Sequence, residues 1–96
     1  MSPIKKKKLK KLRNKLDKLD NEFIKLIKKR NIIVKEVLKL KEFKNQIVDK
    51  KRINTILKNI KIKSIKNKID FKITKRIWIN MIWSFIDFDK RNFKKK

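Results

Sequence analysis

Apolar residues in the first half of the chain recur at alternating spacings of three and four. They are Leu9, Leu12, Leu16, Leu19, Phe23 and Leu26, continued in the same register by Ile33, Val37 and Leu40. This spacing is typical of a helix with one apolar seam. Because neither glycine nor proline interrupts the pattern after Pro3, we predict one helix over about residues 5–42. At about 1.5 Å per residue it is roughly 57 Å long.

The seam is too long for the rest of a 96-residue chain to cover. A chain of this size buries only a limited part of its apolar surface, so the uncovered stripe predicts a partner helix. The simplest partner is the same helix of a second subunit in a symmetric homodimer.

The second half predicts two shorter helices. The first helix breaks at Lys44–Gln46, and Asp49 suits the N-cap of a second helix. Residues 61–68 (KIKSIKNK) alternate isoleucine and lysine in part, and without a second strand candidate we predict a helix end followed by a loop. Asp70 suits the N-cap of a third helix that runs to about Asn92. Its apolar face contains Ile73, Ile77, Trp78, Met81, Ile82 and Phe85.

We therefore predict an all-α fold: one domain over residues 1–96, with three helices per subunit, a long first helix and an intertwined homodimer. Residues 1–6 and 93–96 are expected to be basic tails. The chain has no run of about 18 apolar residues for a membrane span, and no apolar stretch of a secretion signal follows Lys5–Lys8. We expect a cytoplasmic protein that does not bind membranes.

The composition is strongly basic, with 33 Lys and Arg against 9 Asp and Glu and a net charge of +24. Such an excess favours anionic partners, and a basic helical protein that binds nucleic acid is one interpretation. However, only five basic residues are arginine. Lysine, isoleucine and asparagine all have A+T-rich codons, so a biased genome also explains the excess. Nucleic acid is thus not the expected partner, and each arginine becomes informative.

Several kinds of chemistry are excluded because glycine, cysteine and histidine are absent. There is no glycine-rich phosphate loop, no Cys or His ligand for zinc, no disulfide, and no Ser-His or Cys-His nucleophile. We expect no metal and no cofactor.

Arg30 takes the core position of the seam between Phe23 and Val37. An arginine at a helix interface is costly unless an anion meets it. One interpretation is an ion pair with an acidic residue of a neighbouring helix, for which the candidates are Asp17, Asp20 and Glu22. The other is an anionic ligand held inside a helix bundle.

Three further basic residues favour the ligand. Lys41 follows Arg30 by 11 residues, so on a continuous helix the two point within roughly 20° of each other. Arg52 lies near the start of the second helix, where the helix dipole favours anions. Arg13 lies roughly 25 Å from Arg30 along the axis, and would reach the site of a partner in an antiparallel dimer. Arginine is hard to replace where it binds a carboxylate with two hydrogen bonds. These basic residues together therefore favour a ligand with two carboxylates.

These residues carry a resemblance. The segment LRNKLDKLDNEFIKLIKKR, then Lys41, then VDKKR, then RIWINMIWSFI resembles the all-helical chorismate mutase family over about residues 9–90. The resemblance implies an intertwined dimer of three-helix subunits, with two sites that each take an arginine from the partner. It implies conversion of chorismate, a small dianion, to prephenate in aromatic amino-acid biosynthesis.

The resemblance also implies roles for residues at the matching positions. Arg13 would bind a carboxylate in the partner's site, and Arg30 the other carboxylate. Lys41 would donate to the ether oxygen and a carboxylate. Asp49 and Arg52 match the Asp-x-x-Arg at the start of the second helix.

Three positions depart from the usual pattern. Asp89 falls where the family usually has a glutamine that donates to the ether oxygen, and some members have an acid there. Ile53 replaces a glutamate that holds the C4 hydroxyl, and Phe85 falls where serine is common. Isochorismate-pyruvate lyases share the fold. They resemble the chain in having an apolar residue at the position of Ile53 and an aromatic residue at the position of Phe85. This lyase activity is therefore an alternative.

Asp89 has two interpretations. Trp78, Ile82, Phe85 and Asp89 follow one another at intervals of four, three and four, which places a carboxyl on an apolar face where ionisation is disfavoured. There it would be a hydrogen-bond donor, opposed by the charge of Lys41. The alternative is a frayed helix end with Asp89 in water, paired with Lys90 or Arg91.

Overall fold

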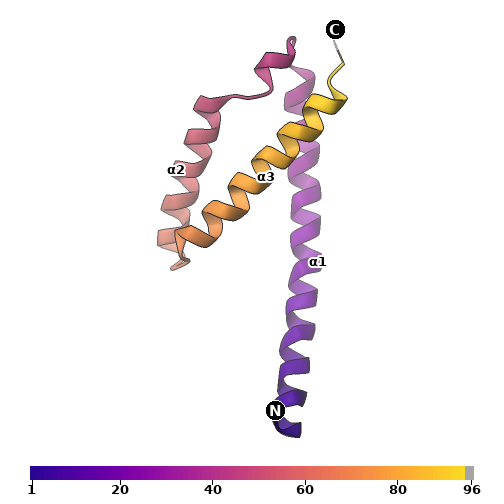
Figure 1. Cartoon of the computed structure of the whole chain (residues 1–96), viewed down its shortest axis with the longest axis vertical. Coiled ribbons are helices and arrows are strands. Elements are labelled where there is room, and N and C mark those ends of the chain that lie inside the picture. Colours follow the sequence, from indigo (N-terminus) through magenta and orange to yellow (C-terminus); the bar gives the residue numbers. More distant parts are fainter. Residues whose placement is uncertain (95–96) are drawn as a thin grey trace. The chain divides into compact units, whose positions relative to one another are not determined.

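The structure is a computed structural model that describes residues 1–94. Helix α1 spans Pro3–Lys39, a short 3-10 helix η1 spans Lys44–Gln46, α2 spans Lys50–Lys66 and α3 spans Phe71–Asn92. Within residues 1–94 there is no strand. The prediction of an all-α chain with three helices and a long first helix is confirmed (Figure 1).

The chain divides into two compact units, Met1–Val34 and Lys35–Lys96. The first unit consists almost wholly of α1. The second contains the last turn of α1, the linker with η1, and the helices α2 and α3. The predicted single domain over residues 1–96 stays a prediction.

Helix α1 begins at Pro3 because Ser2 caps it. The Ser2 hydroxyl accepts a hydrogen bond from the backbone N–H of Lys5 at 3.2 Å, and the Ser2 carbonyl accepts one from Lys6 at 2.9 Å. Proline suits the first helical position because its fixed φ is already helical and it needs no N–H there. Residues 3–6 of the predicted N-terminal tail are therefore helical. At the other end, Lys95 and Lys96 of the predicted C-terminal tail lie outside the described residues.

The seam of α1 is uncovered in the single chain. Leu12 is 51% exposed, and Leu19 and Leu26 are 64% and 63% exposed. Full burial of a leucine side chain contributes about 1.5–3 kcal/mol. The first unit therefore leaves much apolar surface in water, which is the physical basis for expecting a partner helix.

Helix α1 ends at Lys39, three residues before the predicted end. The side-chain oxygen of Gln46 accepts hydrogen bonds from the backbone N–H groups of Glu42 and Phe43, at 2.8 and 2.9 Å. These bonds satisfy two N–H groups that a longer helix would direct to its own carbonyls. The chain therefore leaves the helix and turns into η1.

Helix α2 begins where predicted and is longer than predicted. The Asp49 carboxylate accepts a hydrogen bond from the backbone N–H of Arg52 at 2.9 Å, so Asp49 is the N-cap. The alternating segment is helical to Lys66, which leaves a shorter loop than expected. Lys68, at φ 57°, follows the helix end, and the N–H groups of Lys68 and Ile69 donate to the carbonyls of Ile65 and Ser64. This pair of bonds is a Schellman motif.

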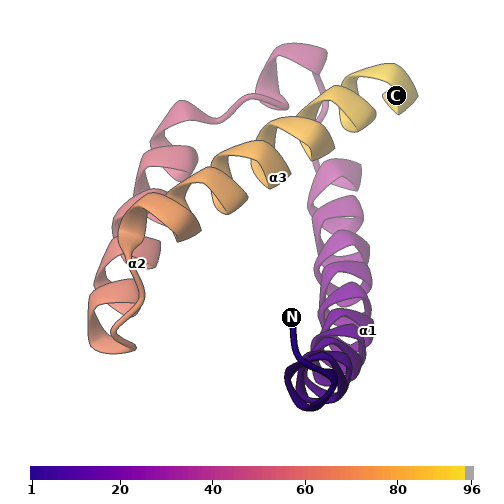
Figure 2. The ribbon, with the colours of Figure 1, turned by 60° about the horizontal axis from the view of Figure 1, so that its bottom comes forward.

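Helix α3 starts at the predicted cap, because Asp70 accepts a hydrogen bond from the backbone N–H of Lys72 at 2.9 Å. The short turn between α2 and α3 makes a helical hairpin, best seen in Figure 2. Near the turn, the hydroxyls of Ser64 and Thr74 are 2.6 Å apart, and Ser64 also donates to the Ile60 carbonyl at 2.6 Å. Because Ser64 is buried, this hydroxyl pair fixes α2 and α3 in one register.

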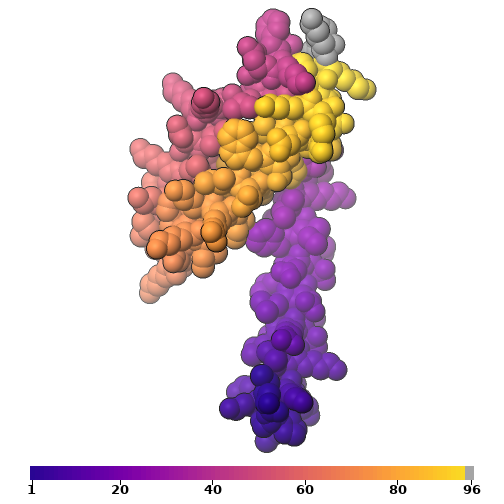
Figure 3. Space-filling model, viewed as in Figure 1, coloured from indigo at the N-terminus to yellow at the C-terminus, as the bar shows by residue number. Residues whose placement is uncertain are grey.

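The core of the second unit is small and lies at the open end of the hairpin. Ile47, Ile82 and Ile86 are buried there, and Leu38, Val48, Ile53, Ile56, Trp78 and Phe93 pack against them. In the space-filling view, side chains of α3 lie directly against those of the linker and α2 (Figure 3). Trp78 is a core residue as predicted, whereas Trp83 is 43% exposed.

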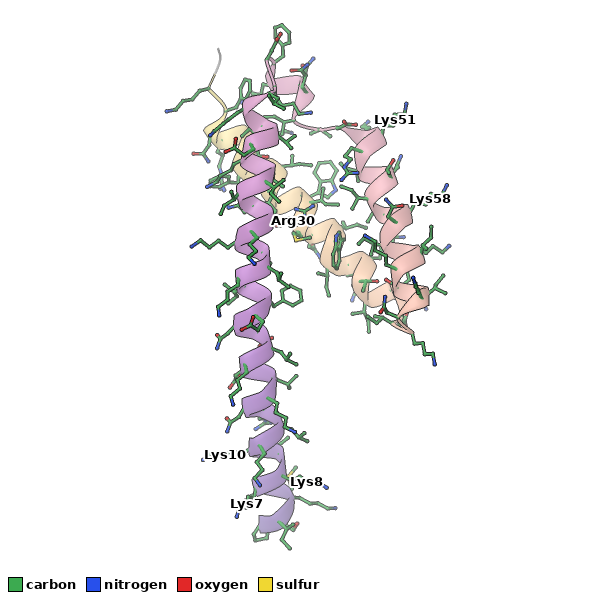
Figure 4. The ribbon with its side chains drawn as sticks, turned by 180° about the vertical axis from the view of Figure 1, so that it is seen from behind. Lys7, Lys8, Lys10, Arg30, Lys51 and Lys58 are labelled. Carbon is green, nitrogen blue, oxygen red and sulfur yellow. The ribbon has the colours of Figure 1, made fainter. Side chains whose placement is uncertain are left out.

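Much of the excess positive charge is on exposed surface. Lys7, Lys8 and Lys10 project from the first turns of α1, and Lys51 and Lys58 project from the side of α2 that faces away from α3 (Figure 4). No helix among residues 1–94 combines the length and the hydropathy that a bilayer crossing requires.

Candidate active site

Arg30 is partly buried on α1, although its seam neighbours Leu26 and Ile33 are 63% and 64% exposed. Figure 4 shows its side chain on the C-terminal third of the helix. Of the acids considered as ion-pair partners from a neighbouring helix, Glu22 pairs with Lys25 of its own helix at 3.4 Å, with both side chains in solvent. Both interpretations of Arg30, the ion pair between helices and the anionic ligand, stay predictions.

Arg13 is exposed on the same helix, about five turns nearer the N-terminus. Both arginines belong to the first unit, and α1 is continuous between them. A separation of 17 residues corresponds to about 25 Å along the axis. One small ligand therefore cannot contact both arginines of one chain, and the action of Arg13 in the site of a second copy stays a prediction.

Lys41 is partly buried, but it is not on the helix that carries Arg30. The argument from an 11-residue interval on a continuous helix is wrong, because α1 ends at Lys39. The backbone N–H groups of Leu40 and Lys41 instead donate to the carbonyls of Val37 and Leu38, both at 3.0 Å. The linker thus sets the direction of Lys41, and its predicted role depends on the resemblance alone.

Asp49 and Arg52 lie at the start of α2. The Asp49 carboxylate holds the backbone N–H of Arg52, while the Arg52 side chain is exposed. The cap therefore fixes the first turn of α2 and presents the guanidinium of Arg52 to solvent. Such a group is available to an anion, and the positive end of the helix dipole adds to its attraction.

Ile53 and Phe85 contribute apolar surface. Ile53 is partly buried and packs against the core of Ile47, Ile82 and Ile86. Phe85 is partly buried on α3. The apolar surroundings of Ile53 explain why an isoleucine is stable here, since a carboxylate in the same place would lose hydration.

Asp89 is the most unusual side chain of the second unit. It is only 7% exposed, on the α3 face that also buries Ile82 and Ile86. Burial raises the pKa of Asp89 above its usual 3.8, and the positive charge of Lys35 opposes that rise. The alternative of a frayed end in water is wrong: α3 continues to Asn92, and Phe93 packs on the core.

The cation that opposes the rise in the pKa of Asp89 is Lys35, and not Lys41 as predicted. No signal in the sequence distinguishes Lys35 from the other lysines. Only the packing of α1's last turn near the end of α3 identifies it. In the part of the chain that the structure describes, no group of three or more acidic, histidine or cysteine side chains is arranged to hold a metal.

Comparison with protein families gives a match to chorismate mutase type II over residues 12–90. The chain belongs to the chorismate mutase type II family. No significant match was found among curated proteins or among solved structures.

The match to chorismate mutase type II includes every candidate site residue, from Arg13 to Asp89. Residues 1–11, which contain six lysines, lie outside it. The membership supports a chorismate mutase activity at the level of the family and agrees with the all-helical fold. The individual roles of the candidate residues remain predictions.

Proposed function

We propose that the protein is a cytoplasmic, homodimeric chorismate mutase that converts chorismate to prephenate in aromatic amino-acid biosynthesis. The family match over residues 12–90 is the observation that carries this proposal. The uncovered apolar seam of α1 supports the dimer, and the surplus positive charge supports a dianionic substrate.

The proposed mechanism needs no nucleophile, metal or proton transfer to the product. The rearrangement is intramolecular, so the enzyme has to hold the substrate in a compact conformation and stabilise charge that develops on the ether oxygen. Arg30 and the partner's Arg13 would each bind one carboxylate. Lys41 and the protonated carboxyl of Asp89 would donate hydrogen bonds to the ether oxygen.

The direct test is an assay of the purified chain with chorismate, following the formation of prephenate. We expect turnover that needs no added metal or cofactor. The same protein is then given isochorismate, and salicylate and pyruvate are measured. Formation of these two products without any prephenate from chorismate would contradict the proposed reaction and establish the lyase.

The lyase is the second candidate, and the packing of Ile53 favours it. The side chain lies against an apolar cluster. Position 53 therefore has no carboxylate that could bind a hydroxyl of the substrate. The same observation is compatible with a mutase that lacks one contact to its substrate.

Replacement of Ile53 by glutamate separates these two possibilities. In a mutase that lacks a hydroxyl contact, Ile53→Glu should raise kcat/KM for chorismate. In a lyase it should lower kcat/KM for isochorismate. Ile53→Gln is the matched control, because both variants place a polar group of similar size against the core. Wild-type rates of Ile53→Glu with both substrates would show that residue 53 does not contact the substrate.

The proposed role of Asp89 predicts a dependence on pH. Only the protonated carboxyl donates a hydrogen bond, so kcat/KM for chorismate should fall as the pH rises through the pKa of Asp89. Asp89→Asn donates at every pH and should remove most of this fall. Asp87→Asn, at an exposed position of the same helix, should keep the wild-type profile. A wild-type profile that is flat or rising between about pH 5 and 8 would remove Asp89 from the site.

A further inference from the structure

The last turn of α1 places an ammonium group beside the end of α3. Lys35 Nζ lies 5.4 Å from the centroid of the Phe88 ring, within the range of a cation–π interaction. Phe88 directly precedes Asp89, whose side chain is 7% exposed. All three residues belong to the second unit. The Lys35 ammonium group thus lies against the ring of the residue that directly precedes a carboxyl shielded from water.

Lys35 is itself exposed, like most other charged groups on the neighbouring elements. Glu36 and Lys39, in the same turn of α1, pair with each other at 3.2 Å and are well exposed. The remaining ones are Lys41, Glu42, Lys44 and Asp49 of the linker, Lys50, Lys51 and Arg52 of α2, Asp87, Lys90 and Arg91 of α3, and Lys94. All of these except the partly buried Lys41 are exposed. Burial raises the pKa of Asp89, and Lys35 is the charge that lowers it.

We propose that Lys35 is a positioning residue for the mutase reaction. Its ammonium group, which lies over the Phe88 ring, limits the pH range in which the Asp89 carboxyl is protonated and donates a hydrogen bond to the substrate. The inference rests on the proposed function, because Asp89 has a substrate to bind only if the protein is the proposed mutase. Lys35 itself touches neither the substrate nor the ether oxygen in this scheme.

The two protonation states of Asp89 respond differently to their surroundings. Poor hydration disfavours the carboxylate, and a neighbouring ammonium favours it. Without Lys35 only the first effect remains, so the carboxyl stays protonated to a higher pH. The range of pH in which Asp89 donates then extends upward.

The test uses the full chain with Lys35→Met, which removes the charge and keeps an apolar stem against the Phe88 ring. The pKa of Asp89 is measured by carbon-13 NMR of its carboxyl group, and kcat/KM for chorismate is measured over the same pH range. We expect both the pKa and the falling limb of kcat/KM to move to higher pH. Lys39→Met, in the same turn, should move neither, and Lys35→Arg should retain the wild-type values.

An unchanged pKa of Asp89 in folded Lys35→Met would overturn the inference, and so would a raised pKa with an unmoved kcat/KM profile. If Lys35→Met does not fold, Phe88→Leu serves instead, because it removes the aromatic anchor and keeps the charge. It should also raise the pKa of Asp89. The NMR titration needs no turnover, so a wild-type protein without mutase activity would contradict the proposed function separately from the Lys35–Asp89 interaction.

Discussion

Replacement of Arg30 by lysine should lower kcat/KM for chorismate at least about a hundredfold while the dimer stays intact. Lysine keeps the positive charge but loses the planar pair of N–H donors that binds a carboxylate with two hydrogen bonds. Charge-assisted hydrogen bonds contribute about 1.5–3 kcal/mol each, and each 1.4 kcal/mol or so is a factor of ten in rate. Steady-state kinetics at several chorismate concentrations measures the loss.

The matched control for Arg30→Lys is Arg76→Lys, because Arg76 is exposed on α3. This variant should have the kcat/KM of the wild type. Sedimentation or size-exclusion chromatography checks that both variants have the wild-type oligomeric state. Near-normal turnover of Arg30→Lys would contradict the assignment of Arg30 to a substrate carboxylate and favour the ion pair between helices.

Mixing two inactive variants should restore activity if Arg13 acts on the partner's site. Arg13→Ala and Arg30→Ala should each be nearly inactive as homodimers, because each lacks one carboxylate contact in both sites. In the mixed dimer, one site lacks both side chains and the other has both. Each mixed dimer should thus have about half the wild-type activity, and an equal mixture about a quarter, since half of its dimers are mixed.

The mixing experiment needs independent evidence that subunits exchange. Mass spectrometry of the two variants, one of them labelled with nitrogen-15, gives the fraction of mixed dimers. Each variant treated alone by the same exchange procedure is the control and should remain inactive. Complete exchange without recovered activity would show that Arg13 does not act on the partner's site.

Local patterns in the sequence identified most of the fold. The heptad spacing from Leu9 identified α1, and the isolated acids Asp49 and Asp70 marked the starts of α2 and α3. These features depend on interactions within a few residues of the chain, so they are visible without the structure. The end of α1 was missed, because Gln46 closes the helix from four residues beyond Glu42 with its side chain.

The site was less accessible to prediction from the sequence. The four-three-four spacing on α3 supports a buried Asp89 as one of two interpretations, and it points to Lys41 as the opposing cation, whereas the structure gives Lys35. In a chain with so many lysines, only packing between segments far apart in the sequence identifies the right one. The resemblance supplied the roles of Lys41 and Arg52, which the geometry of one chain does not.

Lys68 shows what the absence of glycine does to the heat resistance of this fold. A left-handed residue is needed to close α2, and glycine adopts that conformation without steric cost. Lysine at this position costs on the order of 1 kcal/mol. For a chain of this length, each kcal/mol corresponds to about 4–8 °C in Tm. One turn between two helices therefore lowers the melting temperature by several degrees, as a consequence of a composition without glycine.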